Sequence, residues 1–261
     1  MRKLAVKGIK LEDYVSPCSY LEGRTSIIES VLIHFFDHLS LEVLLEQGYR
    51  HFGNYFFRPV CRECHQCIPI RIPVKSFRFS RSAKRLFKRN QDLNVKLDRP
   101  VLYLEAYELY CKHLDRFQDN GQQSYDEFVK SFYYPSPSAY QMTIHDGNKL
   151  VAVSHLDITP KSTSAVYSYY DDSYYAESLG TFLIYKALEL SQRLKQDFFY
   201  LGYYVPENRH MKYKLRFRPN QLLMKENYWL DYLGQDGGIV NPDLTDLGFV
   251  PVTRLNETSI L

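Results

Sequence analysis

Three cysteines at regular gaps form the first group of side chains that could do chemistry. The sequence reads Cys61-Arg-Glu-Cys64-His-Gln-Cys67, with two residues between each cysteine and the next. A tight turn with this spacing brings sulfurs to within about 4 Å of one another, close enough to share one metal site. Cys18 or His65 could supply the fourth ligand. Zinc and an iron–sulfur cluster fit equally, and the alternative is a set of reduced thiols beside a functional turn.

A basic segment follows these cysteines. Residues 75–89 hold seven basic side chains and no acidic one. From Ser80 onward the pattern predicts a helix with apolar residues on one face and cations on the opposite face. Cations without counter-charges repel one another, and a nucleic-acid backbone would relieve that repulsion. The net charge is only +3, so the prediction rests on clustering. The residues predicted to bind the phosphates of an RNA or DNA are Arg81, Lys84, Arg85, Lys88 and Arg89.

The elements that must position these groups centre on residues 164–205. An aromatic run ending at Tyr170, an amphipathic helical pattern from about Ser178 and a second aromatic run predict a strand–helix–strand crossover. A crossover of this length implies a parallel strand pair beside which a ligand binds. Ser178 is the expected N-cap, and the helix start would aim backbone N–H groups at that ligand. With a hairpin predicted over residues 139–158, the fold class is α/β or α+β with a mixed central sheet.

Composition indicates a globular protein. Of 261 residues, 24% are charged and 45% hydrophobic. The 23 Tyr and 16 Phe either build the core or supply rings that stack on bases or line a pocket. No apolar run reaches membrane-spanning length, so we expect a cytoplasmic protein with no membrane partner and no disulfides. We divide the chain into an N-terminal subdomain with the cysteine triplet (1–75), a larger domain with the basic helix (76–230) and a C-terminal tail (231–261).

Several sequence blocks together match one protein family. They are Tyr20-Leu-Glu-Gly-Arg24, Phe56-Phe-Arg-Pro-Val-Cys61, the basic helix, Ser178-Leu-Gly-Thr181, Tyr200-Leu-Gly-Tyr203 and Met211-Lys-Tyr-Lys-Leu-Arg-Phe-Arg-Pro219. In these blocks the chain resembles the bacterial aminoacyl-tRNA–protein transferases, above all the leucyl-tRNA–protein transferases that act on N-terminal Asp or Glu. Eukaryotic arginyltransferases are more distant. The resemblance implies a GNAT-like acyltransferase fold plus a smaller N-terminal segment containing cysteines. It also implies partners, aminoacyl-tRNA and proteins with N-terminal Asp or Glu, and a product marked for N-end-rule degradation.

The resemblance bears on the cysteines as well. Eukaryotic members carry cysteines in an N-terminal segment that can hold an iron–sulfur cluster. Cys18, Cys61, Cys64 and Cys67 occupy comparable places, although Ser-Pro-Cys18-Ser-Tyr departs from the eukaryotic Cys-x-x-Cys.

The implied reaction is the aminolysis of an ester. The donor ester is already activated, so the chemistry requires no cofactor, and positioning two large substrates is the main task. The acceptor ammonium must lose a proton, and the developing oxyanion needs hydrogen-bond donors. The predicted catalytic residues are Ser178 at the donor end, with Asp171, Tyr170 or Tyr203 relaying the proton. An acidic first residue favours Arg or Lys partners, for which we predict Arg58, Arg71, Lys212 and Arg216, with Arg218 as a further choice.

Other interpretations stay open at this point. Residues 212–218 fit a second tRNA-phosphate face nearly as well. Asp171 and Asp172 near the predicted site would suit an arginyl donor, so leucine is favoured by the resemblance alone. A non-catalytic, metal-holding RNA-binding protein would also explain the basic helix and the cysteines. A small-molecule acetyltransferase is disfavoured, because residues 175–180 contain a single glycine and lack the Gly-rich loop for a coenzyme pyrophosphate.

Overall fold

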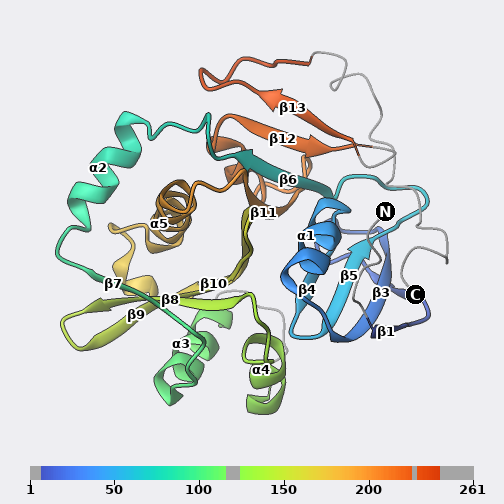
Figure 1. Cartoon of the computed structure of the whole chain (residues 1–261), viewed down its shortest axis with the longest axis horizontal. Coiled ribbons are helices and arrows are strands. Elements are labelled where there is room, and N and C mark those ends of the chain that lie inside the picture. Colours follow the sequence, from blue (N-terminus) through green and yellow to red (C-terminus); the bar gives the residue numbers. More distant parts are fainter. Residues whose placement is uncertain (1–6, 116–123, 225–227, 242–261) are drawn as a thin grey trace.

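A computed structural model describes residues 7–115, 124–224 and 228–241 of the chain. In this part of the chain the strands form two sheets, and Figure 1 shows the smaller, N-terminal sheet beside the larger one. The smaller sheet has five strands in the order β1-β3-β5-β4, with β2 paired to β3, and helix α1 packs on it. Its elements are β1 (Lys7–Lys10), β2 (Tyr14–Pro17), β3 (Thr25–Phe35), α1 (His38–Glu46), β4 (Arg50–Phe52) and β5 (Tyr55–Pro59).

The larger sheet has eight strands among the described residues, in the order β13-β12-β6-β11-β10-β9-β8-β7. Only β10 and β11 pair in parallel there, so the sheet is mixed, as expected. The strands are β6 (Ile68–Pro73), β7 (Asn94–Asp98), β8 (Ala139–Asp146), β9 (Lys149–Ile158), β10 (Ser162–Tyr170), β11 (Phe198–Tyr204), β12 (Asn220–Leu223) and β13 (Trp229–Leu233). The helical segments are α2 (Arg81–Arg89), α3 (Leu104–Leu114), α4 (Tyr125–Phe132), η1 (Asp172–Tyr174), α5 (Leu179–Arg193) and η2 (Lys212–Arg216).

The predicted crossover is present, because α5 connects the parallel strands β10 and β11. Their pairing is short and runs only from Ser162 opposite Phe198 to Ser164 opposite Tyr200. Beyond that point the pairing of β10 with β9 shifts register between Ala165 and Tyr167, and that of β11 with β6 shifts between Tyr200 and Tyr203. We call the stretch in which β10 and β11 run on without pairing the splay. Its base is at Ser164 and Ala165, where the pairing ends, and its upper end is at Tyr170, where β10 ends. The strand ends beyond it have lost one neighbour, which leaves backbone groups and side chains available for other contacts.

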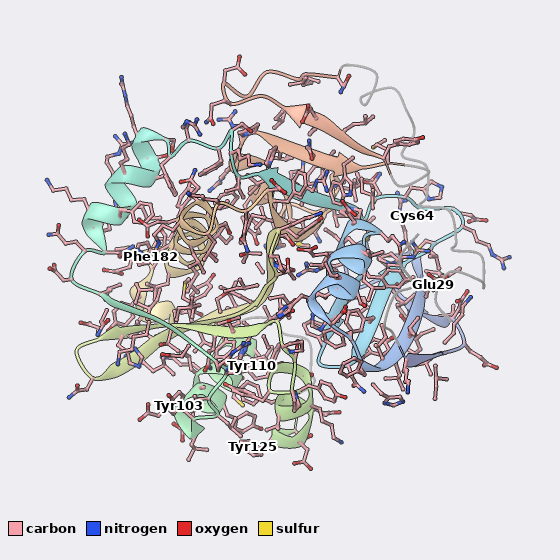
Figure 2. All side chains as sticks on the ribbon, viewed as in Figure 1. Glu29, Cys64, Tyr103, Tyr110, Tyr125 and Phe182 are labelled. Atoms are coloured by element: carbon pink, nitrogen blue, oxygen red, sulfur yellow. The ribbon has the colours of Figure 1, made fainter. Side chains whose placement is uncertain are left out.

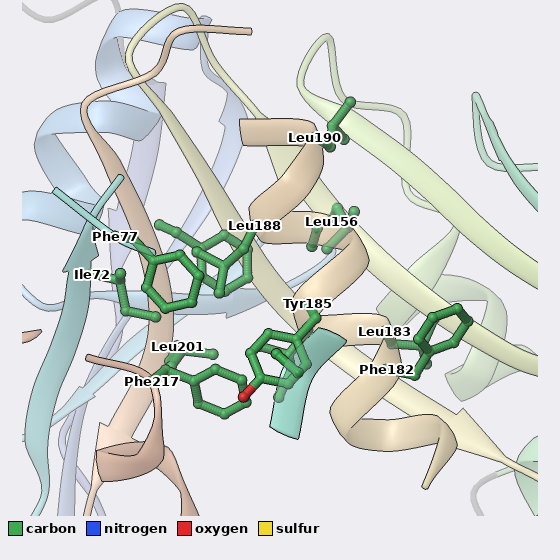
Figure 3. Packing of buried hydrophobic residues seen from close by; sticks show 14 of the residues in the cluster. Ile72, Phe77, Leu156, Phe182, Leu183, Tyr185, Leu188, Leu190, Leu201 and Phe217 are labelled. Atoms are coloured by element: carbon green, nitrogen blue, oxygen red, sulfur yellow. The ribbon is translucent and has the colours of Figure 1, made fainter. Parts of the chain in front are cut away.

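Helix α5 covers one face of the larger sheet. Its apolar residues Leu179, Phe182, Leu183 and Leu188 are almost completely buried, in the cluster that Figure 3 shows. Helix α2 packs beside it, with the Phe87 ring 5.7 Å from that of Phe182. The 3.6-residue period of an amphipathic helix therefore holds for α5, and the apolar face of α2 binds it to the same core.

Aromatic side chains form most of the packing on the opposite face. Tyr110 of α3, Phe128 and Phe132 of α4 and Tyr169 of β10 are buried in one cluster, with neighbouring ring centroids 5.0 to 5.5 Å apart. Tyr169 turns toward α3 and α4, whereas the next residue, Tyr170, packs toward α5. Many of the aromatic residues thus build the core, which is the simpler of the two interpretations of their abundance.

The sheet arrangement bears on the predicted division of the chain. Strand β6 precedes the boundary predicted at residue 75, yet it lies between β12 and β11 in the larger sheet. The boundary predicted after residue 230 falls within β13, and residues 242–261 of the predicted tail lie outside the described residues. The division itself stays a prediction. Within the described part of the chain, no helix combines the length and apolar character needed to cross a membrane.

Candidate active site

The base of the splay is held by an arginine from the smaller sheet. Arg50 of β4 donates to Ser164 Oγ at 2.7 Å and to the carbonyl oxygen of Ala165, where the pairing of β10 with β11 ends. Gly202 of β11 has a φ of 80°, which favours glycine, and a Cβ there would lie 3.6 Å from Arg50 Nε. The two sheets are therefore joined at this point by a cationic side chain.

A lysine approaches the same glycine from η2. Lys214 Nζ donates to the carbonyl oxygen of Tyr203 at 2.6 Å, and it also lies 3.6 Å from the Cβ position of Gly202. Burial and the nearby Arg50 guanidinium lower the pKa of Lys214 to about 7, whereas the Cys67 thiol acts in the opposite direction. Burial likewise lowers the pKa of Arg50. Two cationic groups thus meet at the base of the splay.

The upper end of the splay meets the start of α5. Gly180, in the first turn of α5, allows a close approach of Tyr170, because a Cβ there would lie 2.7 Å from Tyr170 Cε1. Ser178 occupies the N-cap position, as predicted, but its side chain makes no capping hydrogen bond and its φ is 47°. The first backbone N–H groups of α5 therefore have no serine oxygen to bind, which keeps them available as donors.

Tyrosine side chains lie near both ends of the splay. Tyr213 of η2 lies near both Tyr170 and Tyr20. Tyr203 donates its hydroxyl to the carbonyl oxygen of Gly48 at 2.9 Å. Burial raises the pKa of Tyr203 well above its ordinary value, so its phenol is neutral and a poor proton acceptor at neutral pH. A proton relay through Tyr203 stays a prediction, and this environment weighs against it.

Both carboxylate oxygens of Asp171 accept hydrogen bonds. The carboxylate accepts from Lys112 Nζ and Lys149 Nζ at 2.9 Å each and from the backbone N–H and hydroxyl of Ser173 in η1. Burial would raise its pKa, but the two lysines and Ser173 outweigh that effect and hold the pKa well below its usual range. A carboxylate so stabilised is a weak base. Asp171 as the proton acceptor stays a prediction, and its contacts indicate a structural role.

Helix α2 presents its cations to solvent beside the start of α5. Ser80 caps the helix by accepting from the N–H of Ala83, and the five predicted tRNA-binding residues are all exposed. At the end of α2, Arg89 donates to the carbonyl oxygen of Ala176, and Asn90 Nδ2 donates to that of Glu177 at 2.9 Å. The basic helix therefore holds the segment that leads into α5 (Figure 1). The five cations therefore lie together on one helix, next to the start of the crossover helix α5.

The four predicted acceptor-binding residues divide into two kinds. Arg58 is buried and donates to Glu29 Oε1 at 2.8 Å, and Arg71 lies between the rings of Phe198 and Trp229 and donates to Gln221. Both guanidinium groups are engaged inside the fold, which weighs against a role in substrate binding. Lys212 and Arg216 are exposed. Arg218, the further choice, approaches the carbonyl oxygen of Asp236 at 3.5 Å.

The cysteines share one pocket but do not form a metal site. Cys18, Cys61, Cys64 and Cys67 are free thiols that line a pocket of about 260 Å³ between the two sheets, together with Tyr20 and Tyr203. Figure 2 shows Cys64 on the connection that follows the smaller sheet. Burial raises the pKa of Cys67 to about 12, so this thiol is protonated. Within the described ranges, no three His, Cys, Asp or Glu side chains are placed to hold a metal ion, so the residues as arranged do not fit a cluster.

Sequence reasoning missed Arg50 and Lys214. Arg50 lies in Tyr49-Arg50-His51-Phe52-Gly53, which reads as an ordinary turn and strand, and Lys214 is one cation among several in residues 209–218. One signal was present: Lys214 stands between Tyr213 and Leu215, an aromatic and an apolar residue, and it is the residue that the 3-10 turn η2 buries. A cation among such neighbours either reaches the surface or is held inside for a reason.

Comparisons with known proteins agree over most of the chain. Two family models described as Arginine-tRNA-protein transferase match it, the N terminus over residues 16–85 and the C terminus over residues 105–224. An Aspartate/glutamate leucyltransferase from Shewanella sp. (strain MR-4) is 34% identical over 221 residues, which are 82% of this chain and 91% of that protein. One from Acinetobacter baylyi is 32% identical over 82% of each protein. The crystal structure of FemX has a TM-score of 0.49 at 7% identity, over 84% of this chain and 86% of that one, too distant to inform function. By its family models and relatives, the chain belongs to the arginine-tRNA–protein transferase family and is an aminoacyltransferase.

Proposed function

We propose that the protein transfers leucine from leucyl-tRNA to the N-terminal Asp or Glu of other proteins and so marks them for N-end-rule degradation. The observation that carries this proposal is the agreement of family and geometry: relatives named Aspartate/glutamate leucyltransferase match 82% of the chain, and the basic helix adjoins the start of α5 at the splay. A charged tRNA as donor also accords with the predicted cytoplasmic location.

A GNAT-like arrangement is part of the proposal. The parallel strands β10 and β11 part beside the start of α5, and a helix N-terminus offers unpaired N–H groups to a ligand. The donor ester would lie at the start of α5, with its carbonyl oxygen toward the backbone N–H groups of the first turn. Gly180 and Tyr170 bound this position. Because the Ser178 side chain makes no capping hydrogen bond, those N–H groups would be able to donate to the oxyanion.

The reaction balances without a cofactor. The acceptor's α-amine, once deprotonated, attacks the ester carbonyl, a C–N bond forms, and the C–O bond to the terminal ribose of tRNA breaks. The ribose oxygen takes up one proton as it leaves, and the amine nitrogen loses one. No metal and no enzyme nucleophile enters this sequence, since the aminoacyl ester already stores the necessary free energy. Substrate positioning is therefore the main contribution of the protein.

The tRNA backbone would bind along α2. Arg81, Lys84, Arg85, Lys88 and Arg89 form an exposed cationic face with no carboxylate on the helix. Contacts of this kind position a nucleic acid and do not read its bases. Because Arg89 and Asn90 also hold residues 176 and 177, phosphate binding and the ester site would share one support.

A transfer assay tests the proposal. The tRNA is charged with labelled Leu or, separately, labelled Arg and mixed with peptides that start with Asp, Glu or Ala. We expect label from leucyl-tRNA on the Asp and Glu peptides and none on the Ala peptide. Transfer from arginyl-tRNA alone would favour the second candidate, an arginyltransferase with the same acceptors, which accords with the family's description as arginine-tRNA-protein transferases. If no peptide is labelled, the proposal fails, and a non-catalytic RNA-binding role becomes the better interpretation.

The cysteines form a separate question within the proposal. A zinc ion or iron–sulfur cluster at Cys18, Cys61, Cys64 and Cys67 would require these side chains to draw together from the pocket that they line. We expect protein purified without oxygen to contain neither metal in stoichiometric amount and to be active after chelation. Bound iron or zinc, with activity lost on its removal, would contradict this expectation.

A further inference from the structure

Two cations at the base of the splay, the half-buried Arg50 and the buried Lys214, have no carboxylate partner among the described residues. Arg50 donates to Ser164 Oγ and Ala165 O, and Lys214, only 6% exposed, donates to Tyr203 O. All three acceptors are uncharged oxygens. Because both cations lie 3.6 Å from one point beside Gly202, they are at most about twice that distance apart. Below about pH 7, where Lys214 is protonated, they therefore form a pair of like charges inside the protein.

The surroundings do not compensate this charge. Tyr20, which acts on Arg50, has a pKa raised to about 12 by burial and so is neutral. The nearest carboxylate that acts on Arg50 is Asp157, which is bonded to His51 Nε2 at 2.8 Å. An uncompensated buried charge costs several kcal/mol, and the repulsion between two adds to that cost. An anion bound between them would relieve both effects.

We propose that Arg50 and Lys214 bind the side-chain carboxylate of the acceptor's N-terminal Asp or Glu. This inference rests on the proposed function and names the residues that select its acceptor. A guanidinium and an ammonium that converge on one position suit a carboxylate, which accepts from both at once. They replace Arg58 and Arg71, whose donors are already engaged with Glu29 and Gln221.

The location favours a peptide end over a tRNA phosphate. Neither cation lines the pocket of about 260 Å³, but Tyr20 and Tyr203, which do, act electrostatically on Arg50, and Cys67, which also lines it, acts on Lys214. A space of that size admits the first residue of a peptide. Tyr213 lies near Tyr20 and near Tyr170, which packs on Gly180 at the start of α5.

Lys214→Met tests this assignment, with Lys130→Met, an exposed lysine on α4, as the matched control. Transfer from leucyl-tRNA is measured on peptides that start with Asp, Glu, Asn or Gln. We expect the wild-type protein to prefer Asp to Asn by at least about 100-fold. Lys214→Met should lower kcat/KM for Asp and Glu peptides by about 10- to 100-fold, mainly through KM, and leave Asn and Gln peptides unchanged. Lys214→Arg should restore part of the preference, and Lys130→Met should behave as wild type.

Two results would overturn the assignment. An equal loss on Asp and Asn peptides would mean that Lys214 only supports the fold, and a loss of tRNA affinity would mean that the pair binds a phosphate. Arg50→Gln, which keeps a donor toward Ser164, gives a second test should Lys214→Met not fold. If the wild-type protein labels no peptide, the proposed function fails independently, and calorimetry decides the site. Tighter binding of the Asp peptide than of the Asn peptide, lost in Lys214→Met, would uphold it; equal or absent binding would refute it.

Discussion

Two pairs of buried or half-buried cations in this molecule, Arg58 with Arg71 and Arg50 with Lys214, differ in what surrounds them. Arg58 donates to the Glu29 carboxylate, stacks over Tyr49 at 4.6 Å and reaches the carbonyl oxygen of Gln47. Arg71 lies between two rings, with a Gln221 oxygen on Nε. Arg50 and Lys214 reach only backbone carbonyl and hydroxyl oxygens. The first pair is therefore satisfied within the fold, whereas the second keeps charge available for a ligand.

The difference shows why burial alone does not identify a binding residue. Glu29 also accepts from the Tyr49 hydroxyl at 2.5 Å, so its carboxylate is a shared acceptor within the smaller sheet. Burial would raise the pKa of Glu29, but Tyr49 and Arg58 outweigh this effect and lower it. Such a network stabilises the ionised form of both partners. A cation without it is stabilised only when something else supplies the negative charge.

Removing the Glu29 carboxylate that pairs with Arg58 should have the largest effect. Glu29→Gln leaves Arg58 buried without a counter-charge, and we expect the free energy of unfolding to fall by about 3–5 kcal/mol. Chemical denaturation measures this value. Glu12→Gln, an exposed control, should change it by less than about 0.5 kcal/mol. Lys214→Met should cause no comparable loss, and a loss as large as that of Glu29→Gln would erase the distinction between the two pairs.

The exposed cations of α2 should contribute to tRNA affinity, whereas the buried cations should not. Lys84→Glu with Arg85→Glu on α2 should weaken tRNA binding by roughly 10- to 100-fold and flatten its salt dependence, since fewer phosphate contacts release fewer counterions. Equilibrium binding at several salt concentrations measures both effects. Lys96→Glu with Lys130→Glu, both exposed elsewhere, is the control. Unchanged affinity in the α2 variant would leave this helix a solvated surface only.

The pH dependence of stability should report the charge state of Lys214. Its pKa is about 7 when folded and near 10.5 when unfolded, so between these values the unfolded chain binds one more proton. The free energy of unfolding should therefore rise with pH above 7, by up to about 1.4 kcal/mol per unit, relative to Lys214→Met. Unfolding of both proteins from pH 6 to 8.5 gives the difference. A difference that stays constant over that range would indicate an ordinary, charged lysine.

Removing one ring from Arg71 should have the smallest effect. Trp229→Leu removes a cation–π contact at 4.3 Å and the indole N–H bond to Glu46 O at 2.9 Å. We expect a loss of about 1–2 kcal/mol in the free energy of unfolding, since Gln221 and Phe198 remain. Tyr228→Leu, an exposed neighbour, is the control. A loss comparable with that of Glu29→Gln would show that rings satisfy a buried arginine as fully as a carboxylate does.

Regular elements with clear periodicity could be predicted from the sequence. The α5 crossover, the hairpin of β8 and β9 and the capped basic helix α2 each depend on local spacing, and the structure confirms them. The family resemblance is confirmed as well. The position of β6 in the larger sheet depends on pairing with β11 and β12, more than a hundred residues away, which no local pattern encodes.

The site could be predicted only in part, for a physical reason. Choosing among cations requires knowing which of them have partners, and partners are set by tertiary contacts. Arg58 follows aromatic residues on a strand, as a substrate-binding arginine would, but Glu29 opposes it across β3 and β5. Asp171 follows a strand end near the crossover, yet two lysines from α3 and β9 neutralise it. The sequence displays these residue types, but not their distances.

The bonds from the end of α2 to residues 176 and 177 have one further consequence. If the phosphate-binding face of α2 and the ester site share a support, the distance between them is fixed, and the enzyme would select tRNAs by the length of the acceptor stem. An aminoacylated tRNA whose acceptor stem is one base pair longer would still bind α2, but its ester would not lie at the start of α5.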